Sequence, residues 1–273
     1  AEQQAQVLQL FQQFQHPTLQ KDLIELKTVK KVEKGGDVLR IELQLPFAWN
    51  TGVEQVKQQL SDALLKATDS KEIKWIVNYQ IATLKRANNQ PAVKGVKNII
   101  AVTSGKGGVG KSSVSVNLAL ALQAQGARVG ILDADIYGPS IPHMLGAPHQ
   151  RPTSPDNQHI TPIKAYGLSA NSIGFLMDED NATIWRGPMA SSALSQLLNE
   201  TLWDSLDYLV IDMPPGTGDI QLTLSQQIPV TGAVVVTTPQ DIALLDAVKG
   251  VSMFERVSVP VLGIVENMSM HIC

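Results

Sequence analysis

A glycine-rich segment followed by a lysine and a serine lies in the middle of this 273-residue sequence. It fits the pattern G-x-x-x-x-G-K-[ST]. In this pattern the glycines let backbone N–H groups approach phosphate oxygens, Lys111 neutralises phosphate charge and Ser112 holds Mg2+. The spacing therefore predicts a phosphate-binding loop. Its expected nucleotide-binding residues are Gly105, Lys106, Gly107, Gly108, Val109, Gly110, Lys111 and Ser112.

The residues on either side of this loop have the patterns of a strand and a helix. Residues 99–103 are apolar or β-branched, and a helical run covers residues 113–125. A glycine-rich turn without a ligand does not require Lys111 and Ser112 together at the start of a helix. We therefore favour the phosphate-binding interpretation, with the helix start supplying N–H groups to an anion.

Three aspartates end apolar strands further along the chain. Asp133 and Asp135 close the second strand, and the two-residue period of a strand places both carboxylates on one face at its C-terminal end. A pair of aspartates that caps a turn is the alternative, which the position some twenty residues after the phosphate loop disfavours. Asp212 ends another apolar strand, where P-loop enzymes usually have an acidic Mg2+ anchor. To share one ion with Ser112, the strand of Asp212 must lie beside the strand of the phosphate loop.

Two later positions are candidates for nucleotide contacts. Gly216 follows two prolines and is expected to offer its N–H to the terminal phosphate, although an ordinary rigid turn is also compatible with this segment. Asn267 is a candidate for the adenine edge because an amide pairs with both a donor and an acceptor. A turn asparagine fits Asn267 equally well. The strand ends lack the N/T-K-x-D sequence of GTPases, so we favour ATP.

Strand and helix patterns alternate from residue 98 onward. This alternation predicts an α/β fold with a doubly wound, mostly parallel sheet. The strands are continuous apolar runs, which is typical of sheets covered on both faces. The loop at 138–162 has no clear periodicity, and the sequence assigns it no role. The expected strands are 99–103, 128–132, 167–172, 208–211, 233–237 and 261–265, and the expected helices are 113–125, 189–202, 219–227 and 242–257.

The chain before the phosphate loop reads as a separate unit. Residues 1–84 predict a small α+β accessory domain without catalytic spacing, and residues 85–97 predict a polar, basic linker. Residues 98–273 then form the nucleotide-binding domain. Within the first domain we expect a short N-terminal helix, a hairpin of strands at 28–32 and 38–45, a helix at 52–66 and a strand at 73–79.

Charge and composition exclude several classes of protein. A net charge of -3 argues against a general nucleic-acid binder. No stretch approaches 18 uninterrupted apolar residues, and the N-terminus lacks the pattern of a signal peptide. We therefore expect a cytoplasmic protein without membrane or nucleic-acid partners. Cys273 is the single cysteine in the sequence, so an internal disulfide is impossible.

Six segments follow one another along the chain, namely GKGGVGKS, LDADIYGPSIP, WRGPM, DMPPGTGD, TTPQD and VENMS. Taken in order, they resemble the Mrp/ApbC family of bacterial iron-sulfur cluster carriers. This family has the deviant Walker A loop also found in MinD and the nitrogenase iron protein. The resemblance covers about residues 95–273, and the first domain resembles a small domain found with iron-sulfur assembly systems. It implies a Mg2+-dependent, ATP-hydrolysing homodimer that holds a [4Fe-4S] cluster and passes it to apo-proteins, with cluster-assembly scaffolds as partners.

The resemblance also implies roles for individual residues. Lys106, otherwise an exposed loop cation, matches the lysine that reaches across the dimer to the partner's nucleotide, much as an arginine finger does. Asp133 matches a residue that supports Mg2+, and Asp135 matches one that orients the attacking water. The expected catalytic residues are therefore Lys106, Lys111 and Asp135, and the expected Mg2+ residues are Ser112, Asp133 and Asp212.

The cluster ligands of the family are a C-x-x-C pair soon after the VENMS segment. Cys273 matches the first of these cysteines, and its alternative interpretation is a terminal thiol. We therefore expect the nucleotide-binding domain to be C-terminally incomplete and a cluster to be unstable in this chain.

A positioning or partitioning ATPase of the MinD/ParA type, with nucleotide-controlled dimerisation, is the alternative function. The GPSIP and WRGP segments and the first domain favour the cluster carrier. A nucleotide-sensing scaffold with negligible turnover is a third interpretation.

Overall fold

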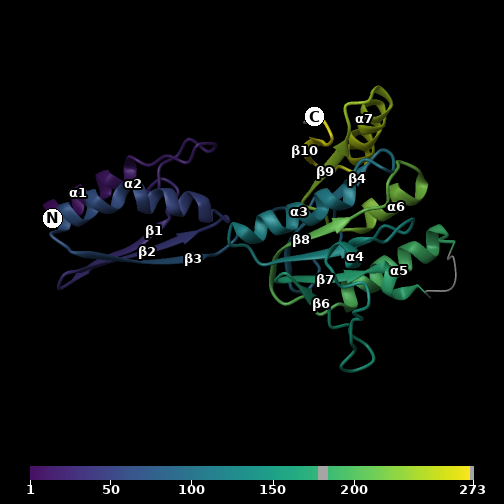
Figure 1. Cartoon of the computed structure of the whole chain (residues 1–273), viewed down its shortest axis with the longest axis horizontal. Helices are drawn as coiled ribbons and strands as arrows, with labels where there is room; N and C mark the ends of the chain where they lie inside the picture. The colour runs from purple at the N-terminus through teal and green to yellow at the C-terminus, as the bar shows by residue number, and fades with distance from the viewer. Residues whose placement is uncertain (178–183, 271–273) are drawn as a thin grey trace. The chain divides into compact units, whose positions relative to one another are not determined.

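The computed structural model describes residues 1–177 and 184–270, apart from the side chains of residues 241–243. The chain divides into two compact units, shown in Figure 1. The first comprises Ala1–Ala82 with Ala124–Ala127, and the second comprises Thr83–Gln123 with the chain from Arg128 onward.

The first unit is a three-stranded sheet with two helices on one face (Figure 1). The strand order is β1-β2-β3, in which β1 and β2 form the predicted antiparallel hairpin and β3 is parallel to β2. The elements are α1 (Glu2–Gln12), β1 (Val29–Gly35), β2 (Val38–Leu45), α2 (Asn50–Thr68) and β3 (Glu72–Tyr79).

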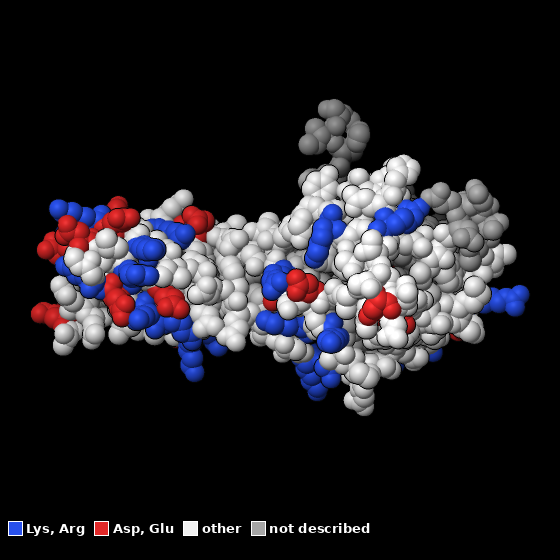
Figure 2. All heavy atoms as spheres, turned by 90° about the horizontal axis from the view of Figure 1, so that it is seen from below, with Lys and Arg blue, Asp and Glu red and all other residues white. Residues whose placement is uncertain are grey.

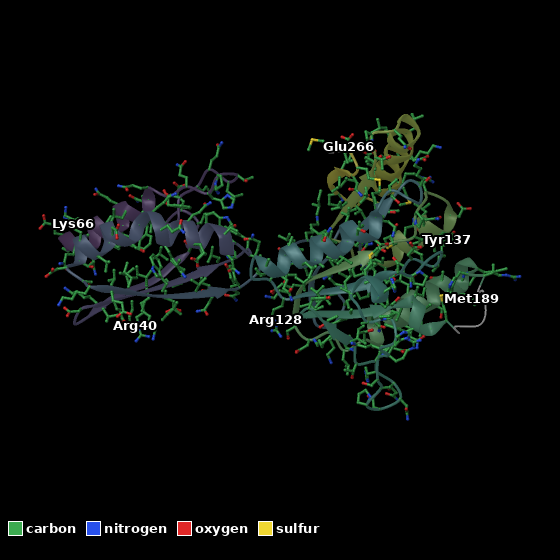
Figure 3. All side chains as sticks on the ribbon, in the orientation of Figure 1. Arg40, Lys66, Arg128, Tyr137, Met189 and Glu266 are labelled. Carbon is green, nitrogen blue, oxygen red and sulfur yellow. The ribbon has the colours of Figure 1, made fainter. Side chains whose placement is uncertain are left out.

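Buried and exposed side chains alternate along β2, so the two faces of the sheet in the first unit differ. Leu39, Ile41 and Leu43 are buried, whereas Arg40 between them is exposed and points away from the helices (Figure 3). Helix α2 buries an apolar stripe at helical spacing, which includes Leu60 and Leu64. Side chains of both charge signs cover the face of this unit seen in Figure 2. One face of the sheet is thus core and the other is a charged surface.

The second unit contains a seven-stranded sheet in the order β10-β9-β4-β8-β5-β7-β6. All neighbouring strands are parallel except β6 and β7, so the predicted α/β fold with a mostly parallel sheet is confirmed. The strands are β4 (Val96–Ser104), β5 (Val129–Asp133), β6 (Ile163–Ala165), β7 (Leu168–Ser172), β8 (Leu206–Asp212), β9 (Gly232–Thr237) and β10 (Val261–Glu266). The helices are α3 (Lys111–Ala124), α4 (Ile141–Met144), α5 (Gly187–Glu200), α6 (Asp219–Gln227) and α7 (Asp241–Arg256), with a 3-10 turn η1 (Ile173–Leu176).

The edge of this sheet at β6 differs from the sequence prediction. Residues 163–165 form an antiparallel strand that periodicity did not predict, because three residues are too few to show a two-residue period. Tyr166 and Gly167 have φ of 51° and 78° and make the tight turn into β7. Strand β7 therefore begins at Leu168.

Strand β4 lies between β9 and β8 in the middle of the sheet. It begins at Val96, opposite Leu206 of β8, so residues 96 and 97 of the predicted linker belong to a strand. The prediction that the strand of Asp212 lies beside the strand of the phosphate loop is confirmed. Because β4, β8 and β5 are parallel neighbours, their carboxyl ends meet at one edge, where ligands bind in open α/β sheets.

Candidate nucleotide-binding site

The glycine-rich segment forms a loop between the end of β4 and the start of α3. Gly108 and Gly110 have φ of 79° and 81°, a region that favours glycine. A β-carbon at Gly110 would also lie 2.3 Å from Nδ2 of Asn267. Helix α3 begins at Lys111, and the first N–H groups of a helix have no partner within it. The loop and helix start thus have the backbone geometry of an anion site.

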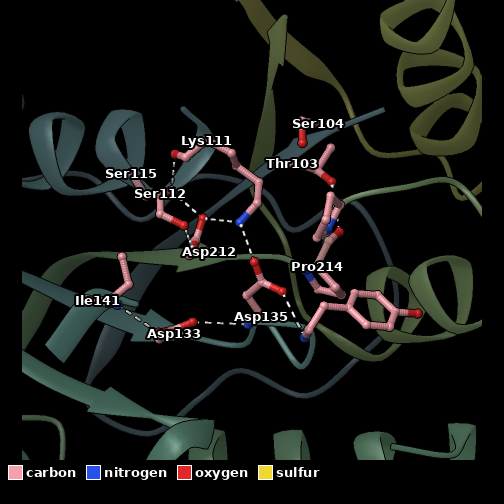
Figure 4. Close-up of polar contacts among 12 residues, drawn as sticks. Thr103, Ser104, Lys111, Ser112, Ser115, Asp133, Asp135, Ile141, Asp212 and Pro214 are labelled. Carbon is pink, nitrogen blue, oxygen red and sulfur yellow. Dashed lines mark hydrogen bonds and ion pairs between the residues drawn. The ribbon is translucent and has the colours of Figure 1, made fainter. Parts of the chain in front are cut away.

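Lys111 is buried at the centre of the candidate site (Figure 4). Its Nζ donates to Oδ1 of Asp212 at 2.7 Å and lies 3.3 Å from Oδ2 of Asp135. Burial raises the pKa of Asp135, and the Lys111 ammonium opposes that rise. The lysine therefore balances two carboxylates in this structure, and a phosphate group would compete with them for its charge.

Asp212 accepts two further hydrogen bonds from helix α3 (Figure 4). Ser112 Oγ donates to Oδ2 at 2.7 Å, and Ser115 Oγ donates to Oδ1 at 2.8 Å. Sequence reasoning missed Ser115, although its position four residues after Lys111 places both on one face of the helix. Ser112 and Asp212 are therefore close enough to share one cation.

Asp133 occupies the same edge of the sheet and is fully buried. It lies opposite Asp212 in the register of β5 and β8. Its carboxylate accepts from the backbone N–H groups of Asp135 at 3.1 Å and Ile141 at 3.0 Å. Burial, and then the charge of Asp212, raises the pKa of Asp133 to about 7.

The prediction for Asp133 and Asp135 assumed that their strand continues through both. Strand β5 ends at Asp133, so the two-residue period does not apply to Asp135. Instead Oδ1 of Asp133 accepts the N–H of Asp135, which turns the chain and brings Asp135 to Lys111. The two carboxylates therefore reach one site through a turn.

This donor set fits Mg2+, which prefers oxygen ligands and usually keeps several waters and substrate phosphates in its shell. The Ser112 hydroxyl and the carboxylates of Asp212 and Asp133 supply oxygens at one sheet edge. Among the side chains that the structure describes, no three His, Cys, Asp or Glu are arranged to hold a metal by themselves. A cation here therefore requires the hydroxyl and the phosphates as well.

Gly216 does not present a free N–H in this structure. Its N–H donates to the carbonyl of Ser104 at 2.8 Å, because the chain after β8 continues alongside the end of β4. Gln221 supports this turn by donating from Nε2 to the carbonyl of Pro215 at 2.8 Å. Contact between Gly216 and a phosphate therefore requires the bond to Ser104 to open.

Asn267 lies against the phosphate loop. Its Nδ2 donates to the carbonyl of Val109 at 3.0 Å, and its N–H donates to the carbonyl of Thr237 at 2.7 Å. Lys106 is partly exposed, and its carbonyl accepts from Ser104 Oγ at 2.6 Å. Cys273 lies outside the described residues. Asn267 thus lies against the loop that carries Lys106 and Lys111, whereas the cluster ligand stays a prediction.

A parallel α/β sheet whose carboxyl edge carries this loop, the buried lysine and the serine-aspartate pair defines a P-loop nucleotide-binding protein. The family model described as "ParA: NUBPL iron-transfer P-loop NTPase" matches residues 95–273. The chain belongs to this family, and the resemblance seen in its sequence is confirmed.

Named relatives agree with this assignment. The chain is 91% identical over 273 residues to the "Iron-sulfur cluster carrier protein" of Haemophilus influenzae, covering 100% of this chain and 74% of that protein. It is 68% identical over 260 residues to the protein of the same name from Salmonella typhimurium, covering 95% of this chain and 70% of that protein.

A solved structure extends the comparison to nucleotide binding. It is a nucleotide-binding protein from Archaeoglobus fulgidus in complex with ADP, 40% identical, with a TM-score of 0.58 over 66% of this chain and 70% of that one.

In the described part of the chain, none of the helices has the length and apolar character needed to cross a bilayer.

Proposed function

We propose that this protein is a Mg2+-dependent ATPase that carries a [4Fe-4S] cluster as cargo and delivers it to apo-proteins. The names of its relatives support the cargo. The observation that carries the nucleotide part is the hydrogen bond of 2.7 Å between Ser112 Oγ and Asp212 Oδ2, beside the buried ammonium of Lys111. The ADP complex of the relative from Archaeoglobus fulgidus supports an adenine nucleotide.

In this proposal the loop binds the phosphates through its backbone N–H groups, and Lys111 exchanges its carboxylate partners for phosphate oxygens. Ser112, Asp212 and Asp133 hold Mg2+, which when bound neutralises charge on the phosphates. Asp135, released from Lys111, orients the attacking water. Each role uses a residue already at the carboxyl edge of β4, β5 or β8.

The remaining roles concern the terminal phosphate, the adenine base and a second copy of the chain. Lys106 acts across a homodimer on the partner's nucleotide, and its partly exposed position on the loop supports this role. Gly216 donates to the terminal phosphate after leaving Ser104. Asn267 contacts the adenine edge from its place beside the loop.

In this proposal each part of the chain has its own role. Residues 1–84 serve as an accessory domain, 85–95 as the linker, and the chain from residue 96, where β4 begins, as the ATPase domain. The protein acts in the cytoplasm, where apo iron-sulfur proteins and cluster-assembly scaffolds are its partners.

Anaerobic reconstitution with iron and sulfide tests the cargo. A [4Fe-4S] cluster normally needs four thiolates, and a two-fold dimer of this sequence supplies two, one Cys273 from each copy. We expect little bound cluster with this sequence, and about one cluster per dimer in a version continued through a Cys-x-x-Cys pair. Equal iron and sulfide in the two versions would overturn the assignment of Cys273.

Transfer is measured by mixing the loaded, continued version with an apo iron-sulfur protein and following that protein's recovered activity. Cys273→Ser in the continued version is the matched control and should remove both cluster and transfer while leaving nucleotide binding intact. A loaded protein that never activates an acceptor would contradict the carrier function.

A further inference from the structure

The first unit contains a groove between helix α1 and strand β1, and none of its lining residues belongs to the nucleotide site. Its volume is about 440 Å3. Val7, Leu8, Val32 and Leu39 give it apolar walls, and Leu8 is 47% exposed to solvent. The groove therefore has room and apolar surface for side chains of a bound molecule.

The strand that borders the groove is an edge strand. β1 pairs with β2 on one side, and no other strand of the described residues pairs with its outer side. The pairing shifts between Val29 and Lys31, so Lys30 has no direct counterpart on β2. An edge strand presents N–H and C=O groups that can pair with an added strand.

The charges around the groove have one sign. Lys30, Lys31 and Lys34 line it, and no Asp or Glu among the described residues does so. Lys31 pairs with Glu33 at 3.0 Å, whereas Lys30 and Lys34 form no ion pair within the described part of the chain. Lysines on an edge discourage pairing with another copy of the same edge, but they favour an acidic strand.

We propose that this groove binds an extended acidic segment of another protein as an added strand on β1. Alternate side chains of a strand point to opposite faces, so apolar residues at every second position enter the groove beside Leu8 and Val32. The acidic residues between them point to the other face of the sheet, where Lys31 lies opposite Glu42 with Lys30 beside it. Lys34 lies opposite the buried Leu39 and so shares the groove face of Val32. This binding is independent of the nucleotide site and of the cluster.

The probes are two labelled libraries of peptides with the length of β1, seven residues. In one library Asp or Glu alternates with Leu, Ile, Val or Phe, and in the other Lys replaces the acidic residues. Binding to the full chain is measured by fluorescence anisotropy. We expect peptides from the acidic library to bind, and the tightest of them to perturb the amide NMR signals of β1 and α1.

Two pairs of variants test the contacts. Lys30→Glu should weaken binding of the tightest acidic peptide about two- to fivefold, whereas Lys74→Glu, on the opposite edge strand β3, should leave it unchanged. Leu8→Ser should weaken binding, whereas Leu19→Ser should not, although both leucines are 47% exposed. Circular dichroism confirms that all four variants are folded.

Several results would overturn the proposal. These are equal binding of the acidic and basic libraries, NMR changes confined to elements other than β1 and α1, and equal effects of the two variants in either pair. Vesicles of anionic lipid provide a further arm. If they bind the chain through Lys30 while no acidic peptide binds, the groove is part of a membrane-facing surface instead.

Discussion

Asp133 and Asp212 lie directly opposite each other on the neighbouring strands β5 and β8. Both are fully buried at the carboxyl edge of the sheet. Lys111 donates to Asp212, whereas the oxygens of Asp133 accept only backbone N–H groups among the described contacts. The arrangement concentrates negative charge where the proposed function requires a cation.

The first prediction concerns stability and pH. Because the pKa of Asp133 is raised to about 7, the folded protein binds a proton that the unfolded chain releases above its ordinary value of 3.8. The folding free energy contributed by this proton is present below that value and is lost as pH rises to about 7. The change is at most about 1.4 kcal/mol per pH unit.

Asp133→Asn removes this titration. The unfolding free energy of this variant, relative to that of the unmodified protein, should therefore increase between pH 4 and 7 and level off above the raised pKa of about 7. Urea denaturation at several pH values, without nucleotide or Mg2+, measures the difference. A difference that does not change with pH would contradict the raised pKa.

Lys111→Ala should abolish nucleotide binding. The substitution removes the buried cation of the loop and leaves the carboxylates of Asp212 and Asp135 without it. Leaving a buried charge unpaired typically costs about 3–5 kcal/mol, so the melting temperature should also fall. Titration with a fluorescent ADP analogue, at a temperature where the variant is folded, measures binding. Retained affinity would reject the role of Lys111 in phosphate binding.

Lys106→Ala should spare nucleotide binding and slow hydrolysis, because its charge is proposed to act across a dimer when the transition state forms. Mixing this variant with Asp135→Ala subunits separates the two sites. If Lys106 acts in trans and Asp135 in cis, each mixed dimer has one site with both lesions and one intact site. Up to half of the activity should return, and no recovery would argue against a trans lysine.

Ser115→Ala tests a positioning residue. The Ser115 hydroxyl fixes Oδ1 of Asp212, so its loss should weaken binding of Mg2+ with ADP about tenfold while ADP affinity in EDTA stays unchanged. Isothermal titration calorimetry in both buffers measures the two affinities. Ser115→Thr keeps a hydroxyl and should restore binding. Equal losses with and without Mg2+ would show that Ser115 acts only on the loop.

The sequence predicted the features that depend on local pattern. The motif around Lys111 and the apolar runs of the central strands were sufficient for the fold class and for placing β8 beside β4. Local sequence patterns could not predict the features that depend on tertiary contacts. The bond from Gly216 to Ser104 and the place of Ser115 arise from elements that meet only after folding. The turn at Asp135 arises because β5 ends at Asp133 and Oδ1 of Asp133 accepts the N–H of Asp135, a contact that strand periodicity does not encode.

The ion pairs of Lys111 also have a kinetic consequence. In the structure its ammonium is already neutralised by Asp212 and Asp135, so these carboxylates act as an internal competitor for the phosphate position. Binding then includes a step in which the pairs separate. At high nucleotide concentration the observed association rate should reach a plateau set by that separation, and Asp135→Asn should raise the plateau. Stopped-flow measurements with a fluorescent nucleotide would reveal this limit directly.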